Sequence, residues 1–307
     1  MTDANTMTDA IKMTNVKKAG TRANPDAAGK VWLVGAGPGD AELLTLKAYR
    51  ILQQADVWLV DDLVSADVRA LAPTHVRIVS VGKRGGSPST SQSFILRLMA
   101  RYAKSGLQVA RVKGGDPFIF GRGGEELAWL GERGIAAEAV GGMTAGLASA
   151  SALNLPLTHR EVARGVAFVT AHTADSSRPD WAALAKSQLT LVCYMGMSRH
   201  EQLQQELLDA GFPADLPVAV VERVSCRNER SLITTLVAMS ADIRATGLGS
   251  PALLILGRAV DYRVQANAEP LLTNTTNPVV MTIERADVQG CGQADIAAAC
   301  SVLAQAV

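Results

Sequence analysis

The sequence predicts an α/β protein made of two α/β domains. Short β-branched runs alternate with longer segments of helical period, and the same alternation starts again after the proline-containing segment LNLPLTHR. Strands separated by helices favour a mainly parallel sheet that helices cover. The chain has 307 residues, of which 48% are hydrophobic and 19% are charged, so it is long and apolar enough to bury two cores.

The first domain is expected over residues 29–153. Residues 1–28 are polar and aperiodic, which predicts a disordered leader. The expected strands are VWLV 31–34, VWLV 57–60, VRIVSV 76–81 and VARV 109–112. A helix is expected from Ser91, a good N-cap residue, to Lys104, because apolar residues between them share one face. A second helix of small residues is expected from Thr144 to Ala152.

The second domain is expected over residues 154–263. Pro156 disfavours helix at Leu155, so this segment is a natural crossover between the domains. The expected strands are VAFVT 166–170, TLVCYM 190–195, PVAVVE 217–222 and PALLIL 251–256, and the expected helices run from about Arg199 to Ala210 and from about Thr235 to Ala245. Residues 264–307 form a tail with an Ala-rich, helical end and no assigned role.

Composition excludes several classes of partner. The chain has 30 Lys and Arg against 29 Asp and Glu, so no global field attracts nucleic acid or an anionic membrane surface. No apolar run approaches the roughly 20 residues that span a bilayer, and the start lacks a secretion signal. We therefore expect a cytoplasmic protein. Its cysteines form no CxxC pair, which favours reduced thiols over a metal site.

The first glycine-rich segment, GAGPGD at 35–40, directly follows the first expected strand. A dinucleotide fingerprint needs a third glycine three positions after the second, and Pro38 removes a backbone donor from the loop. A nicotinamide-dependent oxidoreductase is therefore disfavoured. A purely structural turn and a ligand-facing loop both remain open.

The second glycine-rich segment is more specific: VARVKGGDPFIFGRGGEE at 109–126. Two glycines after a strand let the backbone approach a ligand, and Asp116 can accept hydrogen bonds from hydroxyl or ammonium groups. Arg111, Lys113 and Arg122 place cations around the same loop, which suits a ligand that carries carboxylates. The alternative is a set of solvated surface charges, and this is the preferred interpretation for Lys113 alone.

These segments, together with PLTHR, TLVCYMGM and SPALLILGR in this order, resemble the tetrapyrrole methylases from Gly29 to Asp261. The resemblance implies two domains with S-adenosyl-L-methionine, the methyl donor, in the cleft between them, no metal, a small-molecule tetrapyrrole substrate and a homodimer. It extends to the members that methylate uroporphyrinogen III at C2 and C7, giving precorrin-2 and S-adenosylhomocysteine. A methyltransferase for a later corrinoid precursor and a non-catalytic S-adenosylmethionine-binding module are the alternatives.

The resemblance also implies roles for particular residues. Cofactor contacts fall on Pro38, Gly114, Gly115, Asp116, Ile119, Thr144, Ala145, Met195 and Val224. Catalytic roles fall on Asp61, Lys83 and Arg122, and substrate contacts fall on Arg122, Glu125, Arg160, His172 and Met195. The alternative interpretation of Asp61 is a helix N-cap or turn residue, and that of Lys83 is a solvated loop charge. The sequence departs from the family pattern at Asp62, where Arg is common, and at Ala171 and Val224, where Gly is usual.

Overall fold

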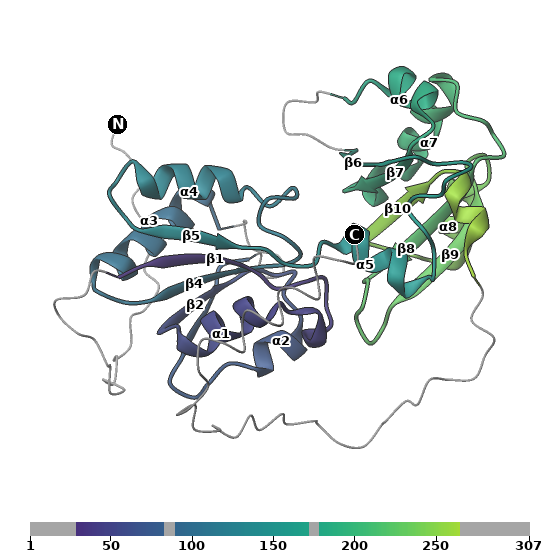
Figure 1. Cartoon of the computed structure of the whole chain (residues 1–307). Helices are drawn as coiled ribbons and strands as arrows, with labels where there is room; N and C mark the ends of the chain where they lie inside the picture. Colours follow the sequence, from purple (N-terminus) through teal and green to yellow (C-terminus); the bar gives the residue numbers. More distant parts are fainter. Residues whose placement is uncertain (1–28, 83–89, 172–177, 265–307) are drawn as a thin grey trace, which may run out of the picture. The chain divides into compact units, whose positions relative to one another are not determined.

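The computed structural model describes residues 29–82, 90–171 and 178–264, which contain two five-stranded sheets (Figure 1). The predicted leader, almost all of the predicted tail, Lys83 and His172 lie outside the described residues. The α/β class is confirmed. The division into domains at 153 and 154 stays a prediction.

The first sheet is entirely parallel. Its strands are β1 (Val31–Gly35), β2 (Val57–Val60), β3 (Arg77–Ser80), β4 (Val109–Lys113) and β5 (Ala137–Val140), in the order β3-β2-β4-β1-β5. Four of them match the strands expected from sequence, and β5 was not anticipated. Because the strands are parallel, the loops that follow all of them meet at one edge of the sheet, where ligands bind in open α/β folds.

Helices cover both faces of this sheet. On one face lie α1 (Leu46–Gln54) and α2 (Ala66–Ala70), and on the other lie α3 (Gln92–Lys104) and α4 (Gly123–Gly131) (Figure 1). The first turn of α3 is capped as predicted, because Ser91 Oγ accepts a hydrogen bond from the Phe94 amide at 3.3 Å. On the α1 face, the fully buried Trp58 ring donates its Nε1 hydrogen to the Leu52 carbonyl at 3.0 Å.

The second sheet is mostly antiparallel. Its strands are β6 (Val166–Thr170), β7 (Thr190–Tyr194), β8 (Pro217–Glu222), β9 (Arg230–Thr235) and β10 (Ala252–Leu256), in the order β6-β7-β10-β8-β9. Only β6 and β7 run parallel to each other. Strand β9 was not anticipated from sequence, and it pairs with β8 as a hairpin. A connection this short can join only antiparallel strands, so a parallel sheet is impossible here.

Helices again cover both faces of the second sheet. One face packs against α6 (Trp181–Ser187), the short η2 (Met197–Arg199), α7 (His200–Asp209) and α8 (Met239–Thr246). The other face packs against α5 (Ala145–Ala152) and η3 (Arg258–Tyr262). Helix α8 starts later than the expected Thr235 because that residue still belongs to β9. Helix α5 follows the first sheet in sequence and packs on the second.

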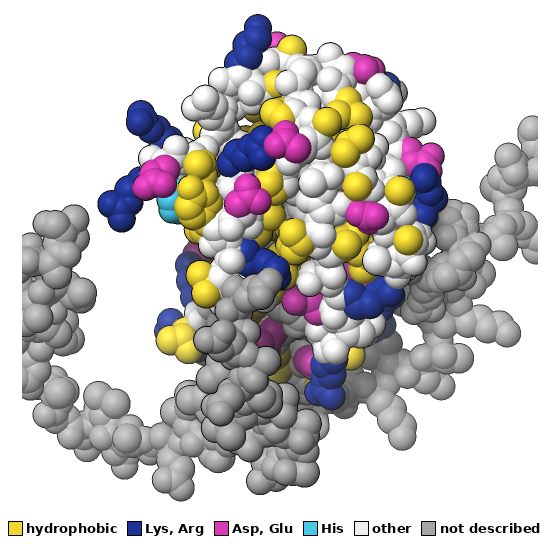
Figure 2. All heavy atoms as spheres, turned by 90° about the vertical axis from the view of Figure 1, so that its right-hand side faces the viewer, with side chains coloured by type: hydrophobic (Ala, Val, Ile, Leu, Met, Phe, Trp, Pro, Cys, Tyr) yellow, Lys and Arg dark blue, Asp and Glu magenta, His cyan; other side chains and the backbone are white. Residues whose placement is uncertain are grey.

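The charged surface agrees with the balanced composition. Figure 2 shows one face, on which Lys and Arg side chains are interspersed with Asp and Glu side chains. Within the described part of the chain, no helix combines the length and the apolar character that a membrane crossing requires.

Candidate active site

Three loops at the carboxyl edge of the first sheet pack backbone against backbone. The Gly115 amide donates to the Gly37 carbonyl at 2.7 Å, and the Gly37 amide donates back to the Gly115 carbonyl at 3.3 Å. A Cβ atom on Gly142 would lie 2.4 Å from the Gly115 carbonyl oxygen and 2.7 Å from the Gly35 carbonyl carbon. The glycines of GAGPGD therefore serve close loop packing, which explains why their spacing differs from that of a dinucleotide loop.

Asp116 ties two of these loops together. Its Oδ1 accepts from the Phe118 amide at 2.8 Å, and its Oδ2 accepts from the Gly142 amide at 3.0 Å. A carboxylate has about four acceptor positions, so each oxygen keeps a lone pair for a ligand. Gly115 lies beside it with φ +69°, a conformation that favours glycine.

The GAGPGD loop also contacts the loop after β8. The Asp40 amide donates to Ser225 Oγ at 3.0 Å, and Cys226 Sγ lies 3.9 Å from the Pro38 carbonyl oxygen. Val224, between these contacts and β8, is buried. Two predicted cofactor positions from distant parts of the sequence, Pro38 and Val224, are thus brought to neighbouring loops.

Tyr194, at the end of β7, contacts one predicted cofactor position, Thr144, and directly precedes another, Met195. Its hydroxyl lies 2.6 Å from Thr144 Oγ1 and accepts from the Gly146 amide at 2.8 Å, at the N-terminus of α5. Burial is the main influence on the Tyr194 phenol and raises its pKa. The next residue, Met195, is 48% exposed, so its side chain is available to a ligand. Sequence reasoning did not single out Tyr194.

Left-handed backbone conformations concentrate in these loops. Seven non-glycine residues of the described chain have positive φ, and five of them lie in the loops after β4, β7 and β8: Phe120, Arg122, Met195, Arg223 and Ser225. Each such residue costs of order 1–3 kcal/mol and persists where the surroundings hold it in place. Strain of this kind gathers at functional sites, so it supports these loops as the site.

Arg122 and Glu125 form an exposed pair at the start of α4. Arg122 Nη2 lies 2.6 Å from Glu125 Oε2, and their side chains are 54% and 59% exposed. The hydrogen bond to Glu125 is the main reason that the pKa of Arg122 is raised, and the same bond lowers the pKa of Glu125. A raised pKa makes Arg122 a poorer proton acceptor, whereas a fixed guanidinium suits binding of a carboxylate.

Asp61 directly follows β2, and the buried Arg111 lies behind it. The Asp61 amide donates to the Val112 carbonyl at 3.0 Å, and Asp61 Oδ2 lies 3.6 Å from Arg111 Nη2. Arg111 and Lys113 were expected to face a ligand, and Lys113 alone to be a solvated charge. Both expectations are wrong, because the two side chains are 3% and 6% exposed. They alternate with Val112 along β4 and point to the sheet face under α3 and α4, where both pair with Glu126.

The remaining predicted residues are more dispersed. Ile119 is half-buried in the loop after Asp116, and Ala145 is the first residue of α5. A Cβ on Gly114 would lie 2.7 Å from Leu63 Cβ, in the loop that follows Asp61. Arg160 is exposed and lines a separate pocket of about 390 Å³, with Thr158, His159, Ala163 and Arg164.

The three departures from the family pattern are accommodated. Ala171 and Val224 are buried and neither has positive φ, so their backbones do not require glycine. Asp62 packs on Gly82, where a Cβ would lie 2.1 Å from the Asp62 carboxyl carbon.

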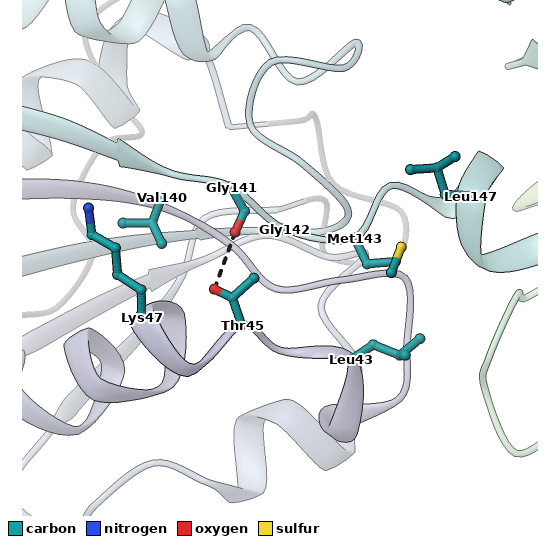
Figure 3. Close-up of a pocket in the computed structure, with 8 residues that line it drawn as sticks. All are labelled: Leu43, Thr45, Lys47, Val140, Gly141, Gly142, Met143 and Leu147. Atoms are coloured by element: carbon teal, nitrogen blue, oxygen red, sulfur yellow. Dashed lines mark hydrogen bonds between the residues drawn. The ribbon is translucent and has the colours of Figure 1, made fainter. Parts of the chain in front are cut away.

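A larger pocket, of about 510 Å³, lies beside the loop after β5. Leu43, Thr45, Lys47, Val140, Gly141, Gly142, Met143 and Leu147 line it, and Thr45 Oγ1 donates to the Gly141 carbonyl at 3.4 Å (Figure 3). It adjoins Thr144 and contains none of the predicted site residues. Among the described residues there is no cluster of three or more His, Cys, Asp or Glu side chains that could hold a metal ion.

Comparisons with known proteins agree with this architecture. The profile of the Tetrapyrrole (Corrin/Porphyrin) Methylases matches residues 30–239. A uroporphyrinogen-III C-methyltransferase of Pseudomonas aeruginosa is 53% identical over 229 residues, which cover 75% of this chain and 93% of that protein. The chain therefore belongs to the tetrapyrrole methylases.

Two solved structures share the fold. One is a uroporphyrin-III C-methyltransferase of Thermus thermophilus complexed with S-adenyl homocysteine, with a TM-score of 0.65, 42% identity, and coverage of 78% of this chain and 97% of that one. The other is a cobalt precorrin-4 methyltransferase, with a TM-score of 0.69, 29% identity, and coverage of 76% and 96%.

Proposed function

We propose that this chain transfers methyl groups from S-adenosylmethionine to C2 and C7 of uroporphyrinogen III, giving precorrin-2 and S-adenosylhomocysteine. The observation that carries the proposal is the extent of likeness to the Pseudomonas aeruginosa enzyme, because this chain covers nearly the whole of that protein. The strained loops at the carboxyl edge of the first sheet supply a site for such a reaction.

The loop residues fit the methyl donor. Gly115 keeps its backbone free of a side chain, Asp116 retains acceptor capacity, and Met195 is exposed. When bound, S-adenosylmethionine supplies a methyl group already made electrophilic by its sulfonium, so we expect no metal ion in the reaction. We assign its contacts to Pro38, Gly114, Gly115, Asp116, Ile119, Thr144, Ala145, Met195 and Val224.

The remaining residues act on the substrate. The attacked pyrrole carbon already carries a side chain, so methylation makes it quaternary and leaves a positive charge on the macrocycle, which is neutralised when a proton leaves another position of the macrocycle. We assign the acceptance of that proton to Asp61, which is partly exposed beside the glycine loop. Arg122 and Arg160 are exposed cations suited to substrate carboxylates. Glu125 orients Arg122 through their paired contact. Roles for Lys83 and His172 rest on family resemblance alone.

A second candidate is methylation of a later corrinoid precursor. The likeness to a cobalt precorrin-4 methyltransferase favours it, at lower identity than the likeness to the uroporphyrinogen enzymes. A third candidate, binding of S-adenosylmethionine without turnover, was suggested by Asp62, Ala171 and the tail. Ala171 gives it no support, since the backbone conformation of this residue does not need glycine.

One experiment separates these candidates. The protein is incubated anaerobically with S-adenosylmethionine and uroporphyrinogen III, and in parallel with later corrinoid precursors, and product masses are measured. Two methyl groups added to uroporphyrinogen III are expected. Transfer only to a later precursor would select the second candidate, and binding of S-adenosylmethionine with no transfer would select the third.

We further propose a cytoplasmic homodimer with no nucleic-acid or membrane partner. The nearly balanced charge supports the absence of such partners. The homodimer rests on family resemblance, and light scattering of the purified protein tests it.

A further inference from the structure

A group of buried charges lies directly behind Asp61. Arg111 and Lys113 alternate with Ala110 and Val112 along β4, so they continue the inward face that Val109 begins. Glu126 meets them from α4, and its side chain is fully buried. These three charges form a polar end to the apolar core between the first sheet and α3 and α4.

Glu126 is the centre of this group. Its Oε1 accepts from Gln92 Nε2 at 2.9 Å, and Arg111 Nε lies 3.5 Å away from the same oxygen. Lys113 Nζ lies 3.4 Å from the Glu126 carboxylate. The second oxygen, Oε2, has no hydrogen-bond partner among the described residues.

Stability alone does not account for such a group. Moving charges out of water costs several kcal/mol per ion, at about the scale that good pairing restores, so buried ion pairs are often replaceable by apolar residues without loss. The ion-pair contacts of Glu126 are 3.4–3.5 Å long, and its Oε2 lies 3.4 Å from Lys113 Nζ without forming a hydrogen bond. A second role for the group is therefore indicated.

The remaining contacts of Arg111 point to that role. Its Nη1 donates to the Leu59 and Val112 carbonyls, each at 3.3 Å, which fixes the plane of the guanidinium. Its Nη2 then faces Asp61 Oδ2 at 3.6 Å. The side chains differ in exposure, at 3% for Arg111 and 34% for Asp61, so the pair joins the interior to the site.

The charges of the buried group also favour pairing between Asp61 and Arg111. Arg111 and Lys113 carry two positive charges and Glu126 carries one negative charge, so the buried group has an excess of one positive charge that Asp61 neutralises. Burial, followed by the nearby Arg111, lowers the pKa of Lys113, and the attraction of Glu126 and Asp61 opposes that shift.

The backbone of Asp61 is held from two further directions. Arg69 Nη2 donates to the Asp61 carbonyl at 2.7 Å, and the Asp61 amide donates to the Val112 carbonyl. One carboxylate oxygen of Asp61, Oδ1, accepts a hydrogen bond from the Asp62 amide at 3.2 Å. The direction of Oδ2 is therefore set by Arg111.

We infer that Arg111 and Glu126 are positioning residues for methyl transfer: Glu126 orients the Arg111 guanidinium, and Arg111 holds the Asp61 carboxylate toward the substrate. This inference rests on the proposed function, in which Asp61 accepts the proton. Misplacement of a reacting group by about 1 Å can cost on the order of a hundredfold in rate, so a buried orienting group has a measurable effect.

A double-mutant cycle tests the inference. Single-turnover methyl transfer and equilibrium S-adenosylmethionine affinity are measured for the wild type, Asp61→Asn, Glu126→Gln and the double variant. Glu126→Gln should slow transfer by about tenfold or more while cofactor affinity changes less than about twofold. In the Asp61→Asn background, Glu126→Gln should slow methyl transfer by less than about a further twofold, because the carboxylate through which Glu126 acts is already lost. Glu132→Gln, an exposed acid beyond the end of α4, is the matched control and should leave transfer unchanged.

Equal losses in both backgrounds would show that Glu126 acts only on the structure and would overturn the inference, as would an unchanged rate in folded Glu126→Gln. If Glu126→Gln does not fold, Gln92→Ala replaces it. Gln92 is partly exposed, and this variant removes only its hydrogen bond to Glu126. It should slow methyl transfer less than Glu126→Gln does, and this slowing should also vanish in the Asp61→Asn background. A wild-type protein that transfers no methyl group to uroporphyrinogen III would instead refute the proposed function.

Discussion

The Tyr194 hydroxyl lies 2.6 Å from Thr144 Oγ1 and so joins the end of β7 to the first turn of α5. It also accepts from the Gly146 amide at 2.8 Å. Thr144 and Met195, both proposed cofactor contacts, are therefore held by one phenol. Phe120, in the loop after β4, packs against the same ring with centroids 4.9 Å apart.

We expect Tyr194→Phe to lower the free energy of unfolding by about 1–3 kcal/mol, because it leaves the buried Thr144 hydroxyl and the Gly146 amide without this partner. Affinity for S-adenosylmethionine should fall as well. Chemical denaturation and calorimetry measure the two effects. Tyr262→Phe, which removes an exposed hydroxyl at 3.4 Å from Glu161, is the control, and an equal effect of both variants would refute the role of Tyr194.

Asp116→Ala should weaken S-adenosylmethionine binding by about ten- to a hundredfold, since a hydrogen bond to a charged group contributes about 1.5–3 kcal/mol. The protein should also lose stability because the Phe118 and Gly142 amides lose their acceptor. Calorimetry on the folded variant separates the effects. Unchanged cofactor affinity would leave Asp116 with the loop-tying role alone.

Arg122→Ala should retain cofactor affinity and lose most methyl transfer. Its stability should change by less than about 1 kcal/mol, because the pair with Glu125 is more than half exposed. Arg122→Lys should recover little activity if the planar fork is what holds the substrate. Single-turnover transfer measured beside binding tests this, and a wild-type rate in Arg122→Ala would remove the residue from the site.

Gly142→Ala should strongly destabilise the protein, because the new Cβ would lie 2.4 Å from the Gly115 carbonyl oxygen. Gly131→Ala provides a matched control, as no atom lies within 4 Å of its Cβ position in α4. That control should be neutral or stabilising by up to about 1 kcal/mol. Thermal unfolding compares them, and similar midpoints would contradict the close packing of the three loops.

Glu138 should contribute to acid sensitivity. Hydrogen bonds from Lys47 and then Lys30 are the largest influences on its carboxyl and lower its pKa from 4.5 to about 2. A carboxyl with a lowered pKa stabilises the folded state above pH 4.5, and this contribution is lost as the pH falls from 4.5 toward about 2. The stability difference between wild type and Glu138→Gln should shrink across that window and with added salt. A difference independent of pH would contradict the prediction.

Local patterns predicted the elements whose identity depends on neighbours in the chain. The runs VWLV 31–34 and VWLV 57–60 became β1 and β2, and the apolar face after Ser91 became α3 with the predicted cap. Strand β9 escaped prediction because Arg230–Thr235 has little burial of its own and is stabilised by pairing with β8. The period of two in VARVK could have predicted that Arg111 and Lys113 point inward with Val109.

The α/β class, the family and the glycine loops could be predicted from sequence alone, because they reside in short contiguous motifs. Which of these motifs meet depends on how the chain folds. Asp40 reaches Ser225 across 185 positions, and Tyr194 reaches Thr144 across 50. The fold also buries Arg111 behind Asp61 rather than exposing it to a ligand. Burial and hydrogen bonding depend on which elements pack together in space, whereas a local pattern indicates the face of a strand on which a residue lies but not the element that packs against that face.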